Sequence, residues 1–341
     1  MNSSCTKNAQ KKIAIGDFEL RNNCLLAPMS GVTDVPFRRL AWRFGAGMVV
    51  SEMVASEALT KGQEEMRLKA ESAGLPVHMV QLAGREAEWM ARAAQMAEGS
   101  GADIIDINMG CPSKRVTNGY SGSALMRDLD HALRLIDAVT MATDLPVTLK
   151  MRLGWDEHSI NAPQLASRAE AAGIKMITVH GRTRNQFYKG QADWEKVALV
   201  REEISIPLIV NGDITSLPQA RQAIEKSGAD GVMVGRASYG APWLPGAIGQ
   251  ALAGQSLAGN DQPDDLNALI LEHYDQMLSF YGVELGVRNA RKHLGWYLDA
   301  LQLNARQQVL RREILPQKDP QIVISKLQEL LLEHPTRQVA A

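Results

Sequence analysis

The sequence predicts an α/β protein in which a TIM (β/α)8 barrel is followed by a C-terminal all-helical domain. Eight short apolar runs recur about every 30 residues between Cys24 and Arg236, which is the length of one strand-plus-helix unit. Between the runs lie stretches with apolar residues at three- and four-residue spacing, as in amphipathic helices. From Leu266 onward the helical pattern continues without further runs. The count of eight favours a closed barrel over an open doubly wound sheet, the main competing fold.

The eight predicted strands are almost continuously apolar, which indicates a parallel sheet buried on both faces. They are CLLAPM from Cys24, MVVSEM from Met48, VHMVQLAG from Val77, IIDINMG from Ile104, VTLKMR from Val147, MITVHGR from Met176, PLIVNGD from Pro207 and GVMVGR from Gly231. The helical stretches close on a glycine, the expected C-terminal stop. We therefore expect a polar tail over residues 1–15, a barrel over 16–250 and a helical domain over 251–341.

The charge balance restricts the partners that this protein can have. The 37 Lys and Arg residues and the 38 Asp and Glu residues give a formal net charge of -1. Proteins that coat nucleic acid by bulk charge usually have a strong basic excess, so that class is excluded. A local basic patch remains compatible with this balance.

The cysteines and the length of the apolar runs indicate in which cellular compartment the protein is expected. Cys5, Cys24 and Cys111 have the spacing of neither a disulfide framework nor a zinc site, so we expect a reducing compartment and no metal. The chain opens on a polar stretch and lacks the run of about 18 apolar residues that a membrane-spanning helix needs. We expect a cytoplasmic monomer with no membrane partner.

Polar and titratable residues follow almost every predicted strand. In a TIM barrel these strand ends meet at one face, where the reactive groups of barrel enzymes lie. The last two endings, NGD from Asn211 and GRA from Gly235, bring glycine backbones and an arginine to the place where barrels commonly bind phosphate. A phosphate-bearing cofactor or substrate is therefore expected.

The sequence supports a specific prediction for two residues at these strand ends, Lys150 and Cys111. Lys150 lies in the middle of a barrel face, where a buried ammonium needs an anionic partner, either a structural carboxylate or a ligand anion. Cys111 follows a strand through a glycine into a proline-fixed turn, which would hold its thiol at the mouth of the barrel. The Gly- and Ser-rich segment that follows it, with Lys114 and Arg115, is either a lid or a merely variable loop.

Taken in order, these motifs resemble those of the tRNA-dihydrouridine synthases, and most of all the bacterial B-type subgroup. The resemblance is carried by LLAPMSGVTDVPFR, VQLAG, DINMGCPSK, VTLKMRLGW, ITVHGRTRNQFYKG, VNGDI, GVMVGRA and RNARKHLGWY. It implies an FMN-dependent enzyme that reduces the C5–C6 double bond of selected uridines in tRNA. NADPH, or alternatively NADH, would supply the electrons.

The resemblance also implies which residues hold FMN. Pro28, Met29 and Ser30 would line the flavin ring, and Gln81 would hydrogen-bond to it. Lys150 and His180 would contact its polar edge, where a cation favours the anionic reduced form. The ribityl chain and phosphate would be held by Asn211, Gly212, Asp213, Gly235 and Arg236.

Roles toward the substrate follow in the same way. Cys111 would protonate C5 of the uracil after hydride has reached C6, and it would do so as a thiol rather than a thiolate. Asn108 and Arg152 would contact the uracil or the flavin. The tRNA itself would be held by Lys114, Arg115, Arg288, Arg291 and Lys292.

Three alternatives stay open at this point. Another FMN barrel, such as a dihydroorotate-dehydrogenase-like enzyme or an enoate reductase, would lack the basic helical domain. A flavin-dependent RNA methyltransferase on the same scaffold would keep almost every flavin residue but would require a folate. A catalytically inactive RNA-binding regulator is disfavoured by the presence of Cys111, Lys150 and His180.

Overall fold

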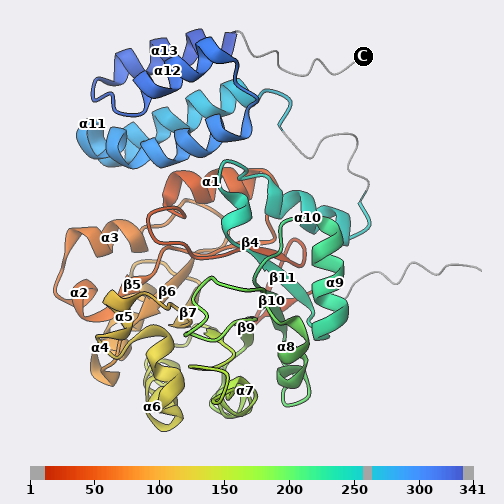
Figure 1. The fold of residues 1–341 in the computed structure, drawn as a ribbon. Helices are drawn as coiled ribbons and strands as arrows, with labels where there is room; N and C mark the ends of the chain where they lie inside the picture. The colour runs from red at the N-terminus through yellow and green to blue at the C-terminus, as the bar shows by residue number, and fades with distance from the viewer. Residues whose placement is uncertain (1–11, 256–262, 333–341) are drawn as a thin grey trace, which may run out of the picture.

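All eight predicted runs form strands in the computed structural model, which describes residues 12–255 and 263–332. Figure 1 shows the strands at the centre of the larger part of the molecule. They are β3 (Cys24–Leu26), β4 (Met48–Val49), β5 (Val54–Ala55), β6 (Met79–Ala83), β7 (Ile104–Met109), β8 (Val147–Arg152), β9 (Met176–His180), β10 (Leu208–Asn211) and β11 (Gly231–Val234). The second run contributes both β4 and β5.

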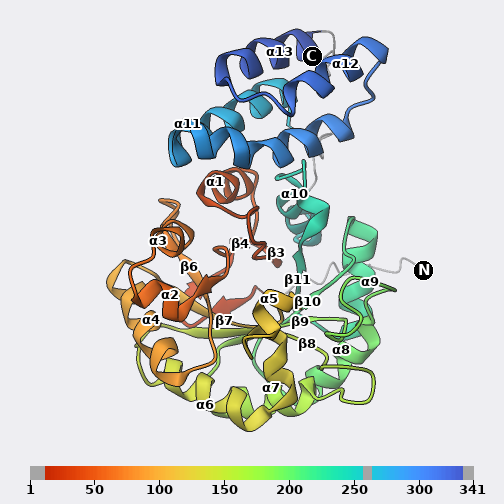
Figure 2. The same ribbon diagram turned by 60° about the vertical axis from the view of Figure 1, so that its left-hand side comes forward.

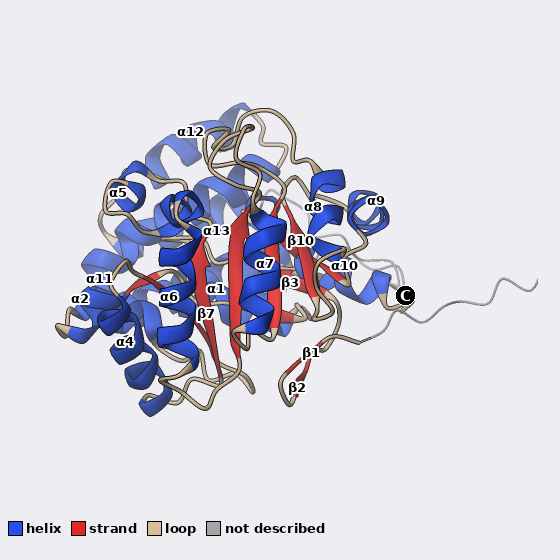
Figure 3. Ribbon diagram, turned by 90° about the horizontal axis from the view of Figure 1, so that it is seen from below, coloured by secondary structure: helices blue, strands red, loops and turns tan. Residues whose placement is uncertain are grey.

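That second run closes the barrel. The strands follow one another in the order β4-β3-β11-β10-β9-β8-β7-β6-β5, and neighbouring strands are parallel. β4 pairs with β3, Val50 bridges to Met79 at the start of β6, and β5 pairs with β6. Because this run changes partner midway, it is divided into two short strands. The predicted (β/α)8 barrel is confirmed, and Figure 3 shows its strands enclosed by helices.

A short antiparallel hairpin precedes the barrel and was not predicted from the sequence. It consists of β1 (Ala14–Ile15) and β2 (Phe18–Glu19). Ile13, Ile15 and Leu20 are buried and pack with the residues that begin several barrel strands, so the hairpin covers the amino-terminal end of the barrel. The polar tail predicted over residues 1–15 is therefore wrong for Ile13 and Ile15, and residues 1–11 lie outside the described ranges.

Helices alternate with the strands and form the outer layer. They are α1 (Val35–Arg43), α2 (Ser56–Thr60), α3 (Glu64–Ala70), α4 (Ala87–Gly99), α5 (Lys114–Thr117), α6 (Leu129–Thr140), α7 (Ala162–Ala171), α8 (Trp194–Arg201), α9 (Leu217–Ser227) and α10 (Leu244–Leu252). Asp34, Asp128, Asp193 and Ser216 cap four of them, each side chain accepting from a backbone N–H of the first turn. The long segment after Cys111 contains α5 and the 3-10 helix η1 (Gly122–Arg127).

The C-terminal domain is all-helical, as predicted, and its described residues form three helices. They are α11 (Leu266–Ala300), which is kinked at Gly282, α12 (Ala305–Ile314) and α13 (Pro320–Leu332). Figures 1 and 2 show α11 lying across α1 of the barrel. The apolar core of this domain includes Leu40 of α1 and Trp243 beside α10, so the two domains share buried surface. Within residues 12–255 and 263–332, no helix is long and apolar enough to cross a membrane.

Two glycines inside helices should respond to alanine in opposite ways. A Cβ at Gly246 in α10 would lie 1.9 Å from the Phe44 carbonyl oxygen, whereas a Cβ at Gly295 in α11 would meet nothing within 4 Å. We expect Gly246→Ala to lower the free energy of unfolding by about 3 kcal/mol, because backbone atoms must move apart. Gly295→Ala should raise it by about 0.5–1 kcal/mol through the helix propensity of alanine. Chemical denaturation measures both, and equal effects would contradict this account of the packing.

Candidate active site

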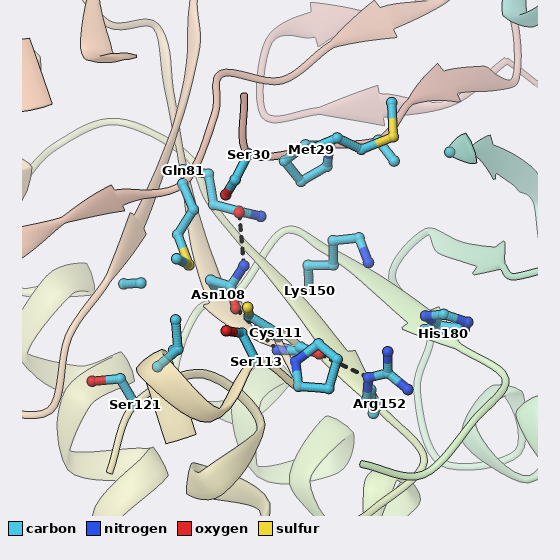
Figure 4. A pocket seen from close by; sticks show the side chains of 18 of the residues that line it. Met29, Ser30, Gln81, Asn108, Cys111, Ser113, Ser121, Lys150, Arg152 and His180 are labelled. Atoms are coloured by element: carbon cyan, nitrogen blue, oxygen red, sulfur yellow. Dashed lines mark hydrogen bonds between the residues drawn. The ribbon is translucent and has the colours of Figure 1, made fainter. Parts of the chain in front are cut away.

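A cavity of about 1180 Å³ opens where the barrel strands end. Every residue that the sequence assigned to FMN lines it: Pro28, Met29, Ser30, Gln81, Lys150, His180, Asn211, Gly212, Asp213, Gly235 and Arg236. Asn108, Cys111, Arg115 and Arg152 line it as well. Figure 4 shows that side chains from separate strands converge on this space. Residues more than 200 positions apart in the chain are thus brought to one site, because parallel strands of a barrel all end at the same face.

A chain of buried polar side chains sets the shape of the turn that carries Cys111. Asp106 accepts from Thr148 Oγ1 and from Gln81 Nε2, each at 2.6 Å. Gln81 Oε1 in turn accepts from Asn108 Nδ2 at 2.7 Å, the bond drawn in Figure 4. Asn108 Oδ1 accepts from the backbone N–H of Cys111 at 3.0 Å. These bonds connect the turn to three neighbouring strands. Asn108 both lines the cavity and holds the backbone of Cys111.

Cys111 itself is held as a protonated thiol. Burial raises the pKa of the thiol, and the N–H of Ser113 and the charges of Arg152 and Lys150 offset that rise only in part. Ser123 donates from both its N–H and its hydroxyl to the Cys111 carbonyl, the latter at 2.8 Å. The side chain is partly exposed to the cavity, unlike Cys24, which is buried in β3. A fixed, protonated, accessible thiol is suited to donate a proton.

Positive charge dominates the side of the cavity that β8 to β11 form. Its charged lining residues are Lys150, Arg152 and Arg236, against Asp213. Asp213 is already paired with Arg182, whose Nη2 lies 2.6 Å from Oδ2. Burial, reinforced by Arg152, lowers the pKa of Lys150 to about 8, and the ammonium donates to the neutral Asn211 Oδ1 at 3.1 Å. A cationic wall of this kind favours an anionic ligand.

His180 contributes hydrogen bonding to this wall without contributing charge. Burial, together with the cations Arg152, Lys150, Arg182 and Arg236, holds the pKa of its imidazole well below the usual value. Its Nε2 lies 3.3 Å from Arg182 Nη1. Because a guanidinium only donates, Nε2 must accept, and the proton is assigned to Nδ1.

The turn after β10 fits its backbone closely against this imidazole. Gly212 has φ 116°, and a Cβ there would lie 2.8 Å from His180 Cδ2. Asp213 follows at φ 55°, in the left-handed region that aspartate tolerates better than most residues. Its Oδ2 also accepts from the N–H of Ala192 at 2.7 Å. The NGD motif therefore needs both its glycine and its aspartate for this conformation.

Arg152 contacts the protein more than the cavity. It is 1% exposed, and its guanidinium donates to the carbonyls of Gly110, Thr183 and Phe187 at 2.8 to 2.9 Å. These bonds join the Cys111 turn to the loop after β9. The structure thus favours a positioning role for Arg152 over the direct substrate contact expected from the sequence.

Tyr188 is a residue of the site that was not singled out from the sequence. It lines the cavity and is 46% exposed, with Arg236 Cζ 4.7 Å and Arg152 Cζ 5.6 Å from its ring centroid. The one available signal was an aromatic pair, Phe187-Tyr188, in a loop that follows a strand ending in His180. Aromatic rings and guanidinium groups are both surfaces on which nucleobases stack.

The residues predicted to bind tRNA differ in exposure and in their contacts with the protein. Arg288 and Lys114 are exposed, and Arg291 Nη2 donates to the Pro316 and Gln317 carbonyls within the helical domain. Lys292 is half-buried and lies against Gly31 of the barrel. Of these three helix residues, Arg288 is exposed, whereas Arg291 and Lys292 each also contact other parts of the protein.

Fold and site together define the class of this protein. A closed (β/α)8 barrel with a protonated thiol and a cationic wall around one cavity is the architecture of a barrel enzyme that takes an anionic ligand. More particularly, the chain belongs to the dihydrouridine synthase family, whose model matches residues 25–334, and it is an oxidoreductase.

Individual relatives agree with this family over most of their length. A Rhizobium leguminosarum bv. phaseoli protein named "Probable tRNA-dihydrouridine synthase" is 55% identical over 314 residues, 92% of this chain and 96% of that protein. The tRNA-dihydrouridine synthase B of Pseudomonas putida is 46% identical over 287 residues, 84% of this chain and 85% of its own. Histamine dehydrogenase from Rhizobium sp. 4-9, a solved structure, aligns with 97% of this chain and 65% of its own at 13% identity and TM-score 0.54, which is a likeness of fold.

The buried ammonium should make Lys150→Met more stable than the wild type when no ligand is bound. Burial lowers the pKa of Lys150 to about 8, so the cationic form costs free energy in the folded state at neutral pH. We expect Lys150→Met to raise the free energy of unfolding by about 1–2 kcal/mol at pH 7.

The pH dependence of the stability difference tests whether the lowered pKa of Lys150 is its cause. Between pH 8 and the usual lysine value of 10.5, the unfolded wild type binds more protons than the folded one, so wild-type stability rises with pH. The advantage of Lys150→Met should therefore shrink over that interval. Denaturation of the ligand-free proteins at pH 7 and pH 10 measures it, and a destabilised variant at pH 7 would be the contrary result.

Proposed function

We propose that this chain reduces selected uridines in tRNA to 5,6-dihydrouridine, with FMN as its cofactor and NADPH as the electron source. The observation that carries the proposal is a protonated Cys111 fixed beside a cationic cavity in a member of this family. Relatives that match most of the chain are named for this activity. The proposal assigns the protein to the cytoplasm, together with its tRNA substrate.

The size and charge of the cavity support FMN. Its volume of about 1180 Å³ exceeds the ~300–1,000 Å³ of common small-molecule sites, which leaves room for a mononucleotide and a uracil together. Asn211, Gly212, Asp213, Gly235 and Arg236 would hold the ribityl chain and phosphate, with the charge of Asp213 already balanced by Arg182.

Other residues that line the cavity suit the flavin ring. Pro28, Met29 and Ser30 would line the ring, and His180 would contact its polar edge without adding charge. Gln81 Nε2 carries two hydrogens, of which the bond to Asp106 uses one. The second hydrogen would serve the ring.

The chemistry needs a hydride, a stabilised anion and a proton. Bound FMN in its reduced form would supply the hydride for C6 of the uracil, and Lys150 would provide a positive charge to the flavin. The uracil then carries negative charge on O4 until C5 is protonated. Cys111 Sγ holds that proton, since burial keeps its pKa above the usual value of a cysteine. Asn108 and Arg152 fix the backbone around this thiol.

The target uridine must leave the folded tRNA to reach this thiol. Extruding a base costs a few kcal/mol, which contacts with the rest of the RNA must offset. Lys114, Arg115 and Arg288 are exposed and remain our candidates for those contacts. Tyr188 adds an aromatic ring at which a base can stack.

Replacing the proton donor should abolish turnover without removing the cofactor. We expect Cys111→Ala to retain FMN and to form dihydrouridine at less than about a hundredth of the wild-type rate, because general acid catalysis is worth about 10²–10⁴-fold. Cys24 is a buried cysteine that does not line the cavity, so Cys24→Ala is the matched control and should keep its activity. Dihydrouridine formed in tRNA transcripts is the readout, and near wild-type formation by Cys111→Ala would overturn the role of Cys111.

Mapping dihydrouridine in cellular tRNA tests the reaction itself. In a strain that lacks the gene, mass spectrometry of tRNA should show dihydrouridine missing from at least one position, restored by the wild-type gene but not by Cys111→Ala. Unchanged dihydrouridine at every position, together with a requirement for folate in vitro, would instead favour an RNA methyltransferase.

A further inference from the structure

Helix α11 of the C-terminal domain contacts two loops that line the cavity. One loop, residues 27–34, joins β3 to α1 and carries Pro28, Met29 and Ser30. The other, residues 235–243, joins β11 to α10 and carries Gly235, Arg236 and Tyr239. The two loops are neighbours because β3 pairs with β11. Figures 1 and 2 both show α11 lying over this part of the barrel.

Lys292 reaches the first loop. Its Nζ lies 2.8 Å from the position that a Cβ would take at Gly31, directly after Ser30. The N–H of Gly31 donates a short hydrogen bond to Glu52, which is 2% exposed at the end of the second apolar run. Burial raises the pKa of Glu52, and the charge of Lys292 opposes that rise. The ammonium therefore lies where it supports a buried carboxylate that holds the backbone of this loop.

A second contact from α11 secures the far end of the same loop. Tyr281 donates its hydroxyl proton to Asp34 Oδ2 at 3.1 Å. Asp34 Oδ1 accepts from the N–H of Phe37 and so caps α1. Both ends of the turn that follows Ser30 are thus fixed by residues of the helical domain, through two buried acids.

Trp296 reaches the second loop. It follows Lys292 by one helical turn, and its ring stacks on Tyr239 with centroids 4.0 Å apart and planes inclined by 13°. The next residue, Gly240, approaches so closely that a Cβ there would lie 2.7 Å from the Trp296 carbonyl oxygen. The Tyr239 ring that lines the cavity is therefore backed by a side chain of the other domain.

We propose that Lys292 and Trp296 are positioning residues, which hold these two loops in the shape that the cofactor requires. The helical domain is then a structural part of the cofactor site, in addition to any part it takes in binding RNA. The inference rests on the proposed use of FMN, since it assigns the two loops to the flavin. It gives Lys292 a role toward the barrel in place of the tRNA contact expected from the sequence.

The test is FMN binding by the full-length protein freed of flavin, measured by the quenching of FMN fluorescence. We expect Lys292→Met, Trp296→Ala and Tyr239→Ala each to weaken binding about tenfold, whereas Lys292→Arg, which keeps the charge, should bind within about twofold of the wild type. Trp296→Phe keeps a ring that can stack and should retain most of the affinity. Lys318→Met removes an exposed cation from the same domain and is the matched control.

Two further readouts separate positioning from general stability. The double variant Tyr239→Ala with Trp296→Ala should bind FMN no more weakly than either single variant, because the first substitution already breaks the stack. Thermal unfolding of the flavin-free Lys292→Met should match that of Lys318→Met, since a purely structural loss would lower both stability and binding. If Trp296→Ala does not fold, the comparison of Trp296→Phe with Tyr239→Ala decides the point.

The outcomes distinguish this inference from the proposed function. A wild type that does not bind FMN would overturn both. A wild type that binds FMN and forms dihydrouridine, while Lys292→Met and Trp296→Ala bind FMN as tightly as Lys318→Met, would overturn this inference alone. If the effects of Tyr239→Ala and Trp296→Ala on FMN binding are strictly additive, the stacking of the two rings does not contribute to holding the loop, and that part of the inference is overturned.

Discussion

The rest of this site depends on positive charge that is kept inside a closed barrel. Lys150, Arg152 and Arg182 lie buried or half-buried at the strand ends, and the carboxylate that lines this side, Asp213, is already paired with Arg182. Placing cations there is costly unless an anion completes the site. The same field keeps His180 neutral, and it lowers the pKa of Cys111 by too little to offset its burial. One electrostatic arrangement therefore favours the ligand, and it leaves the thiol able to donate a proton.

Such a site works only if the groups around the charge are held rigidly. The chain from Thr148 through Asp106, Gln81 and Asn108 gives the Cys111 turn partners on three strands. Arg152 adds a fourth connection by donating to Gly110 and to the loop after β9. Most of these polar groups satisfy one another, so their hydrogen bonds specify one arrangement of the turn.

The helical domain extends this rigidity across the domain boundary. Its core takes in Leu40 and Trp243 of the barrel, and α11 touches the two loops that line one side of the cavity. A domain that binds RNA and also supports the cofactor loops would couple the orientation of the RNA to the shape of the cavity. That coupling needs no moving part, because it follows from shared buried surface.

Much of this protein is determined by local sequence. Apolar runs that recur about every 30 residues specify the eight strand units. Motifs at their ends place Cys111, Lys150 and His180 on one face, since parallel strands of a barrel end together. Chemistry that depends on strand ends is therefore predictable before any contact is known. The division of the second run into β4 and β5 was not, because it arises only where the sheet meets itself.

Only the tertiary structure decided which way long side chains point. Arg291 and Lys292 carry the same charge as Arg288, yet one bonds to carbonyls of its own domain and the other lies against Gly31. Tyr188 and Trp296 likewise contact residues far away in the chain, Arg236 and Tyr239 respectively. Helical spacing defines the face on which a side chain starts, but what that face meets depends on how two domains pack, and no local pattern encodes that contact.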